Sequence, residues 1–197
     1  MHIVAITGAS GPILGIRLIE ELLKAGEEVA VVVSAAAAKV IGHEVLDGAV
    51  YAGMKPLLKG RDAARDLSRL AEYDDDDLFA PIASGSARFE SVTVMPASMK
   101  TLAAVAGGHA SSLITRACDV ALKERRRCIL VARETPLSLT HIENMRAATL
   151  AGAIILPPAP GFYAKPRSVE DIVDFIVGKV IDLLGIDHEL FKRWGER

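Results

Sequence analysis

The chain has 197 residues, with 23 Lys and Arg against 25 Asp and Glu, and its formal net charge is −2. A balance this close to neutral provides no long-range field to attract nucleic acid or an anionic membrane, so we expect neither as a partner. Hydrophobic residues make up 51% and aromatic residues only 5%, which favours a buried parallel sheet and an extensive subunit interface.

The first part of the chain predicts a β–α–β unit. Residues 2–7 are a short β-branched run that ends in a glycine turn. Apolar residues then recur at helical spacing from 14 to 22, and Gly26 ends that helix. Residues 29–33 are continuously apolar, as in a strand buried on both faces, and Ser34 follows as the cap of a second helix.

Residues 47–80 are the least regular part of the sequence, and we expect a loop-rich excursion there. A short helix is predicted around 61–72, and the acidic run 74–77 is interpreted as a solvated loop. Thr140 and Glu143 have capping-box spacing. The remaining predicted elements are strands at 92–96, 128–132 and 153–156 and helices at 98–108, 112–127, 140–152 and 168–184.

These elements predict one α/β domain over residues 1–197, a three-layer αβα structure with a Rossmann-like or flavodoxin-like parallel sheet. No apolar run approaches the roughly 18–20 residues of a membrane span, and no signal peptide is recognised. Cys118 and Cys128 lack paired-ligand spacing, so we expect free thiols and a cytoplasmic protein. The five His residues also lack ligand spacing, and no metal site is predicted.

The glycine turn follows a strand and opens a helix, which is the context of a phosphate-binding turn. Gly8, Gly11 and Gly15 do not match the dinucleotide fingerprint G-x-G-x-x-G. Ser10 occupies a position where a pyrophosphate needs bare backbone, and Ser34 replaces the acidic residue that would hold a ribose hydroxyl. The turn therefore favours FMN over NAD, unless its glycines serve only a tight turn.

Further polar residues follow other predicted strands or lie on a helix. The turn 96–101 and the pair at 133–134 both stand at the carboxyl edge of the sheet, where ligands bind in doubly wound folds. Arg116 and Lys123 are seven residues apart and share one helical face, although a cation at a helix end also complements the helix dipole. The proline-rich loop 157–163 forms either a pocket wall or a cover for the core.

With these pieces in order, the sequence resembles the UbiX family of flavin prenyltransferases, within the superfamily of homo-oligomeric flavin-containing cysteine decarboxylases. The resemblance covers nearly the whole chain. It is carried by the motifs at 7–11, 83–86, 98–101, 116–126, 133–137, 141–145 and 160–163.

The resemblance implies a metal-independent enzyme that binds reduced FMN and dimethylallyl monophosphate. It joins the prenyl group to flavin N5 and C6 and passes the prenylated FMN to a UbiD-type decarboxylase. Members are typically homododecamers with active sites between subunits, and residues 185–197 are expected to form a tail at the interface and active site. The family pattern leaves open whether the donor is a monophosphate or a diphosphate.

The family's functional residues match positions of this sequence one by one. The implied FMN contacts are Gly8, Ala9, Ser10, Ser34, Ser98, Met99, Lys100, Thr101 and Arg133. The implied contacts to dimethylallyl phosphate are Ser84, Gly85, Arg116, Lys123, Tyr163 and Lys179, with Glu44 and Trp194 as further possible site residues. The implied catalytic residues are Ser10, Lys123, Glu134 and Tyr163.

Two details of this match affect the chemistry. Lys179 stands where many members have Arg, so the charge is kept while the bidentate fork is lost. Departure of a phosphate without a metal requires several cations, and Arg116, Lys123, Arg133 and Lys179 provide them. The prediction is that Arg116 and Lys123 converge with Lys179, Tyr163 and Ser84 on the donor phosphate.

The alternative function is an FMN-dependent decarboxylase of cysteinyl substrates, similar to phosphopantothenoylcysteine decarboxylase. Such enzymes usually carry an Asn-containing turn where this chain has 96–99, and a catalytic His early in the chain. The turn here lacks Asn, and His43 lies in a different context. A flavin carrier without catalysis would not need Lys123, Glu134 and Tyr163 together.

Overall fold

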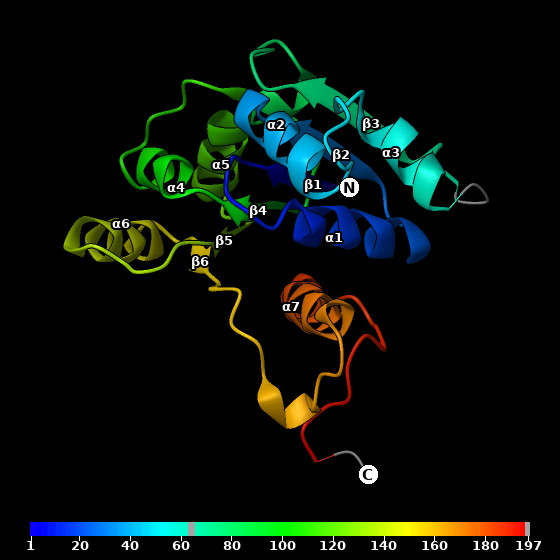
Figure 1. The fold of residues 1–197 in the computed structure, drawn as a ribbon. Helices are drawn as coiled ribbons and strands as arrows, with labels where there is room; N and C mark the ends of the chain where they lie inside the picture. Colours follow the sequence, from blue (N-terminus) through cyan, green and yellow to red (C-terminus); the bar gives the residue numbers. More distant parts are fainter. Residues whose placement is uncertain (63–65, 196–197) are drawn as a thin grey trace.

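The computed structural model describes residues 1–62 and 66–195. One six-stranded sheet runs through the molecule in the order β3-β2-β1-β4-β5-β6, and all neighbouring strands are parallel (Figure 1). The strands are β1 (His2–Ile6), β2 (Val29–Val33), β3 (Leu70–Asp74), β4 (Ser91–Ala97), β5 (Arg127–Ala132) and β6 (Ile154–Ile155). The helices are α1 (Pro12–Lys24), α2 (Ala35–Glu44), α3 (Met54–Arg61), α4 (Met99–Ala106), α5 (Leu113–Lys123), α6 (Leu139–Leu150) and α7 (Val169–Leu184), with 3₁₀ turns at Pro81–Ala83 and Phe162–Ala164.

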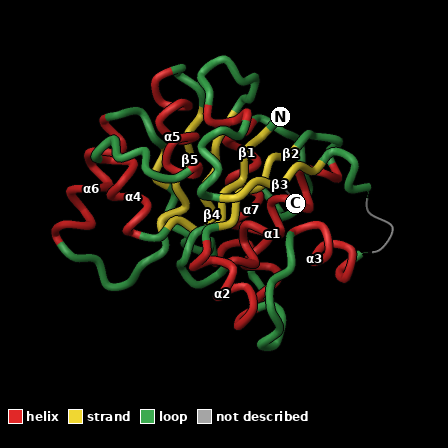
Figure 2. Tube along the Cα trace, turned by 90° about the horizontal axis from the view of Figure 1, so that it is seen from above, coloured by secondary structure: helices red, strands yellow, loops and turns green. Residues whose placement is uncertain are grey.

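The helices form two layers with the sheet between them, which confirms the predicted flavodoxin-like αβα fold. Side chains of α1, α2, α3 and α7 share one core cluster, and side chains of α4 and α5 share the other with Ala148 of α6. Figure 2 shows the yellow strands between the two groups. Because β1 and β4 are neighbours, the chain order reverses between them, and the crevice that binds ligands in such sheets lies at their carboxyl ends. No helix among the described residues is long and apolar enough to cross a membrane.

Serine caps begin several helices as the sequence predicts. Ser34, Ser98 and Ser168 each accept a hydrogen bond from a backbone N–H of the first turn. The expected capping box at Thr140 and Glu143 is wrong. The box is formed two residues earlier by Ser138 with the His141 side chain, because Ser138 has the extended backbone that a cap requires.

The segment 47–80 is more regular than expected, and the helix predicted at 61–72 is wrong. Helix α3 ends at Arg61, and β3 pairs in parallel with β2 at the edge of the sheet. The Glu72 carboxylate of β3 accepts hydrogen bonds from the N–H of Met54 at 2.8 Å and from the Tyr51 hydroxyl at 2.6 Å. This carboxylate fastens the start of α3 to the sheet edge. Residues 63–65 of the predicted helix lie outside the described residues.

The acidic run is not simply a solvated loop. Asp74 is the last residue of β3. Asp75 receives two backbone N–H groups at the start of α5, from Leu113 to its carbonyl at 2.7 Å and from Ile114 to its carboxylate at 3.0 Å. A carboxylate at a helix N-terminus complements the helix dipole, so this part of the run fixes where α5 begins.

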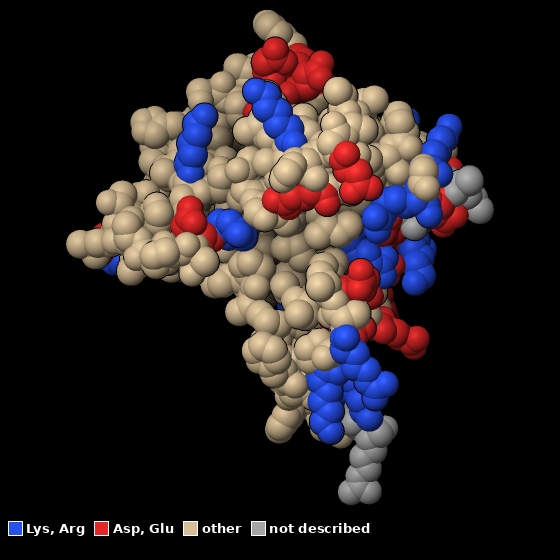
Figure 3. All heavy atoms as spheres, in the orientation of Figure 1, with Lys and Arg blue, Asp and Glu red and all other residues tan. Residues whose placement is uncertain are grey.

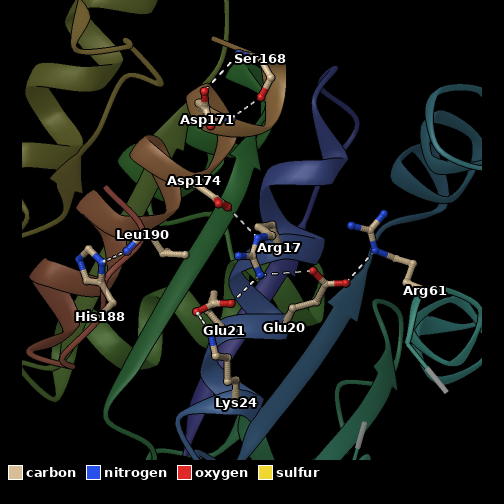
Figure 4. Close-up of polar contacts among 10 residues, drawn as sticks. All are labelled: Arg17, Glu20, Glu21, Lys24, Arg61, Ser168, Asp171, Asp174, His188 and Leu190. Atoms are coloured by element: carbon tan, nitrogen blue, oxygen red, sulfur yellow. Dashed lines mark hydrogen bonds and ion pairs between the residues drawn. The ribbon is translucent and has the colours of Figure 1, made fainter. Parts of the chain in front are cut away.

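A charged network joins the helices that cover one face of the sheet. Arg17 of α1 donates to Asp174 of α7 at 2.7 Å, and Arg61 of α3 donates to Glu20 of α1 at 2.7 Å (Figure 4). Glu20 and Glu21 are buried, so their charges require these Arg partners. The network thereby couples α7 to the helix that begins at the glycine turn.

We expect stability to fall as pH drops below about 6.5, the ordinary pKa of histidine. His2 is buried, with Nδ1 2.8 Å from Ser91 Oγ, and burial lowers its pKa although Glu27 partly opposes this. The unfolded chain therefore binds a proton more readily than the native state, and acid favours unfolding. Urea unfolding measured between pH 8 and 5 tests this: His2→Asn should lose less stability on acidification than the wild type, and equal losses would contradict it.

Candidate functional site at the carboxyl edge of the sheet

Four strand ends are fastened together at the carboxyl edge. The Thr7 hydroxyl donates to the Pro96 carbonyl at 2.8 Å and accepts the N–H of Ser98 at 2.8 Å. The N–H of Ser34 donates to the Ile6 carbonyl, and the N–H of Arg133 donates to the Ala97 carbonyl. The turns after β1, β2, β4 and β5 therefore form one continuous rim.

Thr7 is a residue that sequence reasoning overlooked. Its hydroxyl is buried and bridges the turn after β1 to the turn after β4, which are 91 residues apart in the chain. The available signal is its position, since it is the last polar residue before the glycine turn and follows a fully buried strand.

The turn after β1 approaches a neighbouring helix closely. A Cβ atom on Gly8 would lie 2.6 Å from the Cβ atom of Ala36 in α2, so only glycine fits there. Gly11 has a φ of 92°, a left-handed conformation that also favours glycine. Ala9 is buried behind the turn and Ser10 is partly exposed on it. The sequence therefore packs this turn against the first turn of α2.

Two helix N-termini at this edge fit an anion. Ser34 accepts the N–H of Ala37 at 3.1 Å, and Ser98 accepts the N–H of Thr101 at 3.3 Å. Neither α2 nor α4 has an acidic residue in its first turn, so the positive ends of both dipoles are left without a side-chain counter-charge. This donor set fits the phosphate and hydroxyl groups of FMN.

Three charged residues surround these turns. The Glu44 carboxylate accepts the N–H of Gly11 at 2.9 Å, which places a negative charge beside the Ser10 turn. Arg133 and Glu134 are exposed at the end of β5, and Glu134 accepts the N–H of Thr135 at 3.0 Å. The edge thus offers an Arg for an anion and two carboxylates for proton transfer.

A second group of predicted residues lies along α5, on the face of the sheet covered by α4 and α6. The Arg116 guanidinium donates to the Ala83 carbonyl at 3.0 Å. A Cβ atom on Gly85 would lie 2.5 Å from Lys123 Nζ, and Ser84 Oγ is 2.8 Å from Ser86 Oγ in the same loop. The structure therefore brings Ser84, Gly85, Arg116 and Lys123 together. Lys123 lies toward the amino edge, because α5 ends there and β5 begins at Arg127.

A third group lies on the opposite face. Tyr163 packs edge-on against Trp194, with ring centroids 5.3 Å apart, and Lys179 of α7 forms an ion pair with Asp182 at 3.5 Å. Helices α5 and α7 belong to different core clusters. The prediction that Arg116 and Lys123 converge with Lys179 and Tyr163 is therefore wrong within one chain, since the sheet separates the two groups.

No three His, Cys, Asp or Glu side chains among the described residues gather as metal ligands. Cys118 and Cys128 are both buried free thiols. Burial and a hydrogen bond from Cys128 raise the pKa of the Cys118 thiol. The chemistry of the rim is thus that of hydroxyls, backbone N–H groups, cations and carboxylates.

Comparison with known proteins identifies what this rim is similar to. Residues 2–181 match the Flavoprotein family. The flavin prenyltransferase UbiX of Methanocaldococcus jannaschii is 47% identical over 196 residues, covering 98% of this chain and 97% of that protein. The flavin prenyltransferase UbiX of Pseudomonas aeruginosa is 44% identical, covering 98% of this chain and 93% of that protein.

Two solved structures resemble this one closely. A crystal structure of AnUbiX (PadA1) in complex with FMN and dimethylallyl pyrophosphate has a TM-score of 0.89 and 41% identity, covering 100% of this chain and 97% of that chain. A dodecameric FMN-dependent UbiX-like decarboxylase from Escherichia coli O157:H7 has a TM-score of 0.85 and 36% identity, covering all of both chains. A phosphopantothenoylcysteine-type PPC decarboxylase, with 16% identity and a TM-score of 0.63, shares the fold alone.

Proposed function

The chain belongs to the Flavoprotein family and, within it, to the UbiX flavin prenyltransferases, and from this premise we propose where on the molecule the reaction takes place. The enzyme transfers a dimethylallyl group to FMN. One observation carries the location of the flavin: the Thr7 hydroxyl joins two helix-opening turns at the carboxyl edge, both free of acidic residues in their first helical turns.

The flavin lies across this rim in our proposal. Its phosphate is bound by the N-termini of α2 and α4, and the Arg133 guanidinium adds a cation. Ser10 lies beside flavin N5 and fixes the ring edge. Reduced FMN, when bound, supplies the nucleophilic N5 and C6 atoms. The contributing residues are Gly8, Ala9, Ser10, Ser34, Ser98, Met99, Lys100, Thr101 and Arg133.

The prenyl donor is dimethylallyl monophosphate in our proposal, although AnUbiX holds the pyrophosphate. The two cation groups supply its phosphate contacts, Arg116 and Lys123 with Ser84 and Gly85 on one side and Lys179 with Tyr163 on the other. Cations fixed around a leaving phosphate stabilise the charge that develops on it as the allylic bond breaks. Glu134 handles the proton lost from the flavin, with Glu44 and Trp194 at the margins of the pocket.

Because the sheet separates the two cation groups, one complete pocket requires more than one copy of the chain. We propose that neighbouring subunits complete the site in a homododecamer, the state described for the UbiX-like protein of E. coli O157:H7. Residues 185–197 form a tail that contributes to this interface. The prenylated FMN then passes to a UbiD-type decarboxylase in the cytoplasm, a reducing compartment compatible with the two buried free thiols.

Assembly makes its own prediction, since α6 exposes apolar side chains that a monomer would leave in water. Leu139 and Leu150 are 73% and 74% exposed, and Ala148 is the only residue of α6 that is buried. We expect light scattering to show a large homo-oligomer and Leu139→Glu to shift it to smaller species, because a charge in an apolar interface is costly. Glu143→Lys, an exposed charge change on the same helix, is not expected to have the full effect. A stable monomer of the wild type at micromolar concentration would contradict the assembly.

Anaerobic incubation with reduced FMN and dimethylallyl monophosphate, followed by mass analysis of the flavin, tests the function. We expect a flavin heavier by one dimethylallyl group, and a parallel reaction with the diphosphate compares the two donors. Incubation with a cysteinyl peptide or phosphopantothenoylcysteine tests the decarboxylase alternative, for which this structure offers only a shared fold. Decarboxylation without any prenylated flavin would overturn the proposal.

A further inference from the structure

The C-terminal tail folds back over one face of α7. A Cβ atom on Gly178 would lie 2.6 Å from the Phe191 ring and 2.7 Å from the His188 ring, so the helix makes room for the tail at this position. The Phe191 ring also packs on Phe175, with centroids 4.9 Å apart. Phe175, Gly178 and Asp182 recur at helical spacing and present one continuous face to the tail.

The Asp182 carboxylate fastens the far end of this tail. It accepts both terminal nitrogens of Arg193, at 2.8 and 3.3 Å, and lies 3.1 Å from His188 Nε2. It also lies 3.5 Å from Lys179 Nζ, one turn earlier in α7. Burial raises the pKa of the Asp182 carboxyl, but hydrogen bonds from Arg193 and His188 outweigh this and hold the pKa below its ordinary value.

The tail reaches the other predicted donor contact through aromatic packing. Trp194 follows Arg193 directly, and its ring meets the Tyr163 ring edge-on at 5.3 Å. Tyr163 in turn packs edge-on against Phe175 of α7 at 5.8 Å. Figure 3 shows Lys and Arg side chains gathered at this end of the molecule, so a carboxylate here selects among several cations.

We propose that Asp182 is a positioning residue for prenyl transfer, holding Lys179 directly and Tyr163 through the Arg193–Trp194 end of the tail. This inference rests on the proposed function, in which Lys179 and Tyr163 contact the donor phosphate. A single carboxylate thereby sets the relative placement of the two groups, which lie on different segments of the chain. Arg193 has the closer contact with Asp182, so the ammonium of Lys179 is held in place while it keeps its capacity to bind an anion.

Steady-state kinetics of Asp182→Asn in the FMN-loaded oligomer test the proposal. We expect the KM for dimethylallyl monophosphate to rise about 5- to 10-fold, with a smaller change in kcat and unchanged FMN affinity, because flavin contacts lie at the carboxyl edge. Trp194 is the only Trp of the chain, so its emission should shift to the red as its contact with Tyr163 loosens. Asp182→Glu should restore most of both properties, since it keeps the charge.

Matched variants separate the possible outcomes. Arg193→Gln leaves the buried part of α7 intact and should reproduce the emission shift and part of the KM increase, even if Asp182→Asn does not fold. Glu90→Gln removes a carboxylate that pairs with the N-terminus at 3.8 Å, and it should change neither property. An emission shift without a KM change would make the tail merely structural and overturn the proposal.

The positioning proposal and the donor assignment fail in different ways. If Lys179→Ala and Tyr163→Phe raise the donor KM while Asp182→Asn and Arg193→Gln do not, the positioning role is wrong and the donor assignment stands. If Lys179→Ala and Tyr163→Phe leave the donor KM unchanged, the donor assignment is wrong and the positioning role falls with it.

Discussion

Replacing Lys123 by Ala is expected to lower kcat/KM for prenyl transfer by about 10²–10³-fold, while FMN remains bound. The reason is electrostatic, because a fixed charge aimed at a leaving phosphate acts mainly in the transition state, and loss of one such group typically has this effect. Lys123 lies against the Gly85 backbone and pairs with Glu124, on a loop and helix that do not contribute to the flavin rim. The yield of prenylated flavin and the flavin absorbance of the purified variant measure the two quantities separately.

Lys24→Ala is the matched control for this experiment. Lys24 also lies in the last turn of its helix and also pairs with an acidic residue, Glu21, at 3.6 Å. Loss of a helix-end cation alone changes stability by only about 0.3–1 kcal/mol and affects no chemistry. If Lys123→Ala turns over like wild type and like Lys24→Ala, the basic run of α5 is structural and the donor phosphate binds elsewhere.

Replacing Gly8 by Val is expected to empty the flavin site. The first added carbon would already lie 2.6 Å from the Cβ atom of Ala36, so the turn after β1 and the first turn of α2 must move apart. Overpacking of this kind costs about 1–3 kcal/mol, and the movement separates the two segments that together hold the flavin. We expect FMN binding to weaken at least about tenfold, measured by titration of FMN into the apoprotein.

Gly60→Val provides the comparison for Gly8→Val. A Cβ atom on Gly60 meets nothing within 4 Å, and this residue lies in α3, away from the rim. The variant should bind FMN as the wild type does. Wild-type FMN affinity in Gly8→Val would show that the turn after β1 does not hold the flavin.

Local patterns were sufficient to predict most of the sheet. β1, β2, β4 and β5 are buried almost throughout, and an unbroken apolar run is readable without knowledge of neighbours. β3 was missed because it is an edge strand whose residues alternate between buried and exposed positions, so its apolar signal is short. Its position depends on pairing with β2 and on the Glu72 contacts with α3, which are tertiary interactions.

The flavin rim was also predictable in large part. Gly8, Ser34 and Ser98 each follow a buried strand and precede a helix, and the ends of parallel strands must lie at one edge. The bridging role of Thr7 was not predictable, because its hydroxyl contacts residues about 90 positions away. A hydroxyl that follows a strand has no local feature that reveals such a partner.

The sequence by itself determined the αβα fold, the order of the turns at the carboxyl edge and the preference for FMN over a dinucleotide. These properties depend on spacing within short segments. The tertiary structure alone decided that Lys123 and Lys179 lie on opposite faces of the sheet, and that Lys179 shares Asp182 with the C-terminal tail. The physical reason is that a helix can cover either face of a parallel sheet, and the face is set by the path of the chain between distant strands.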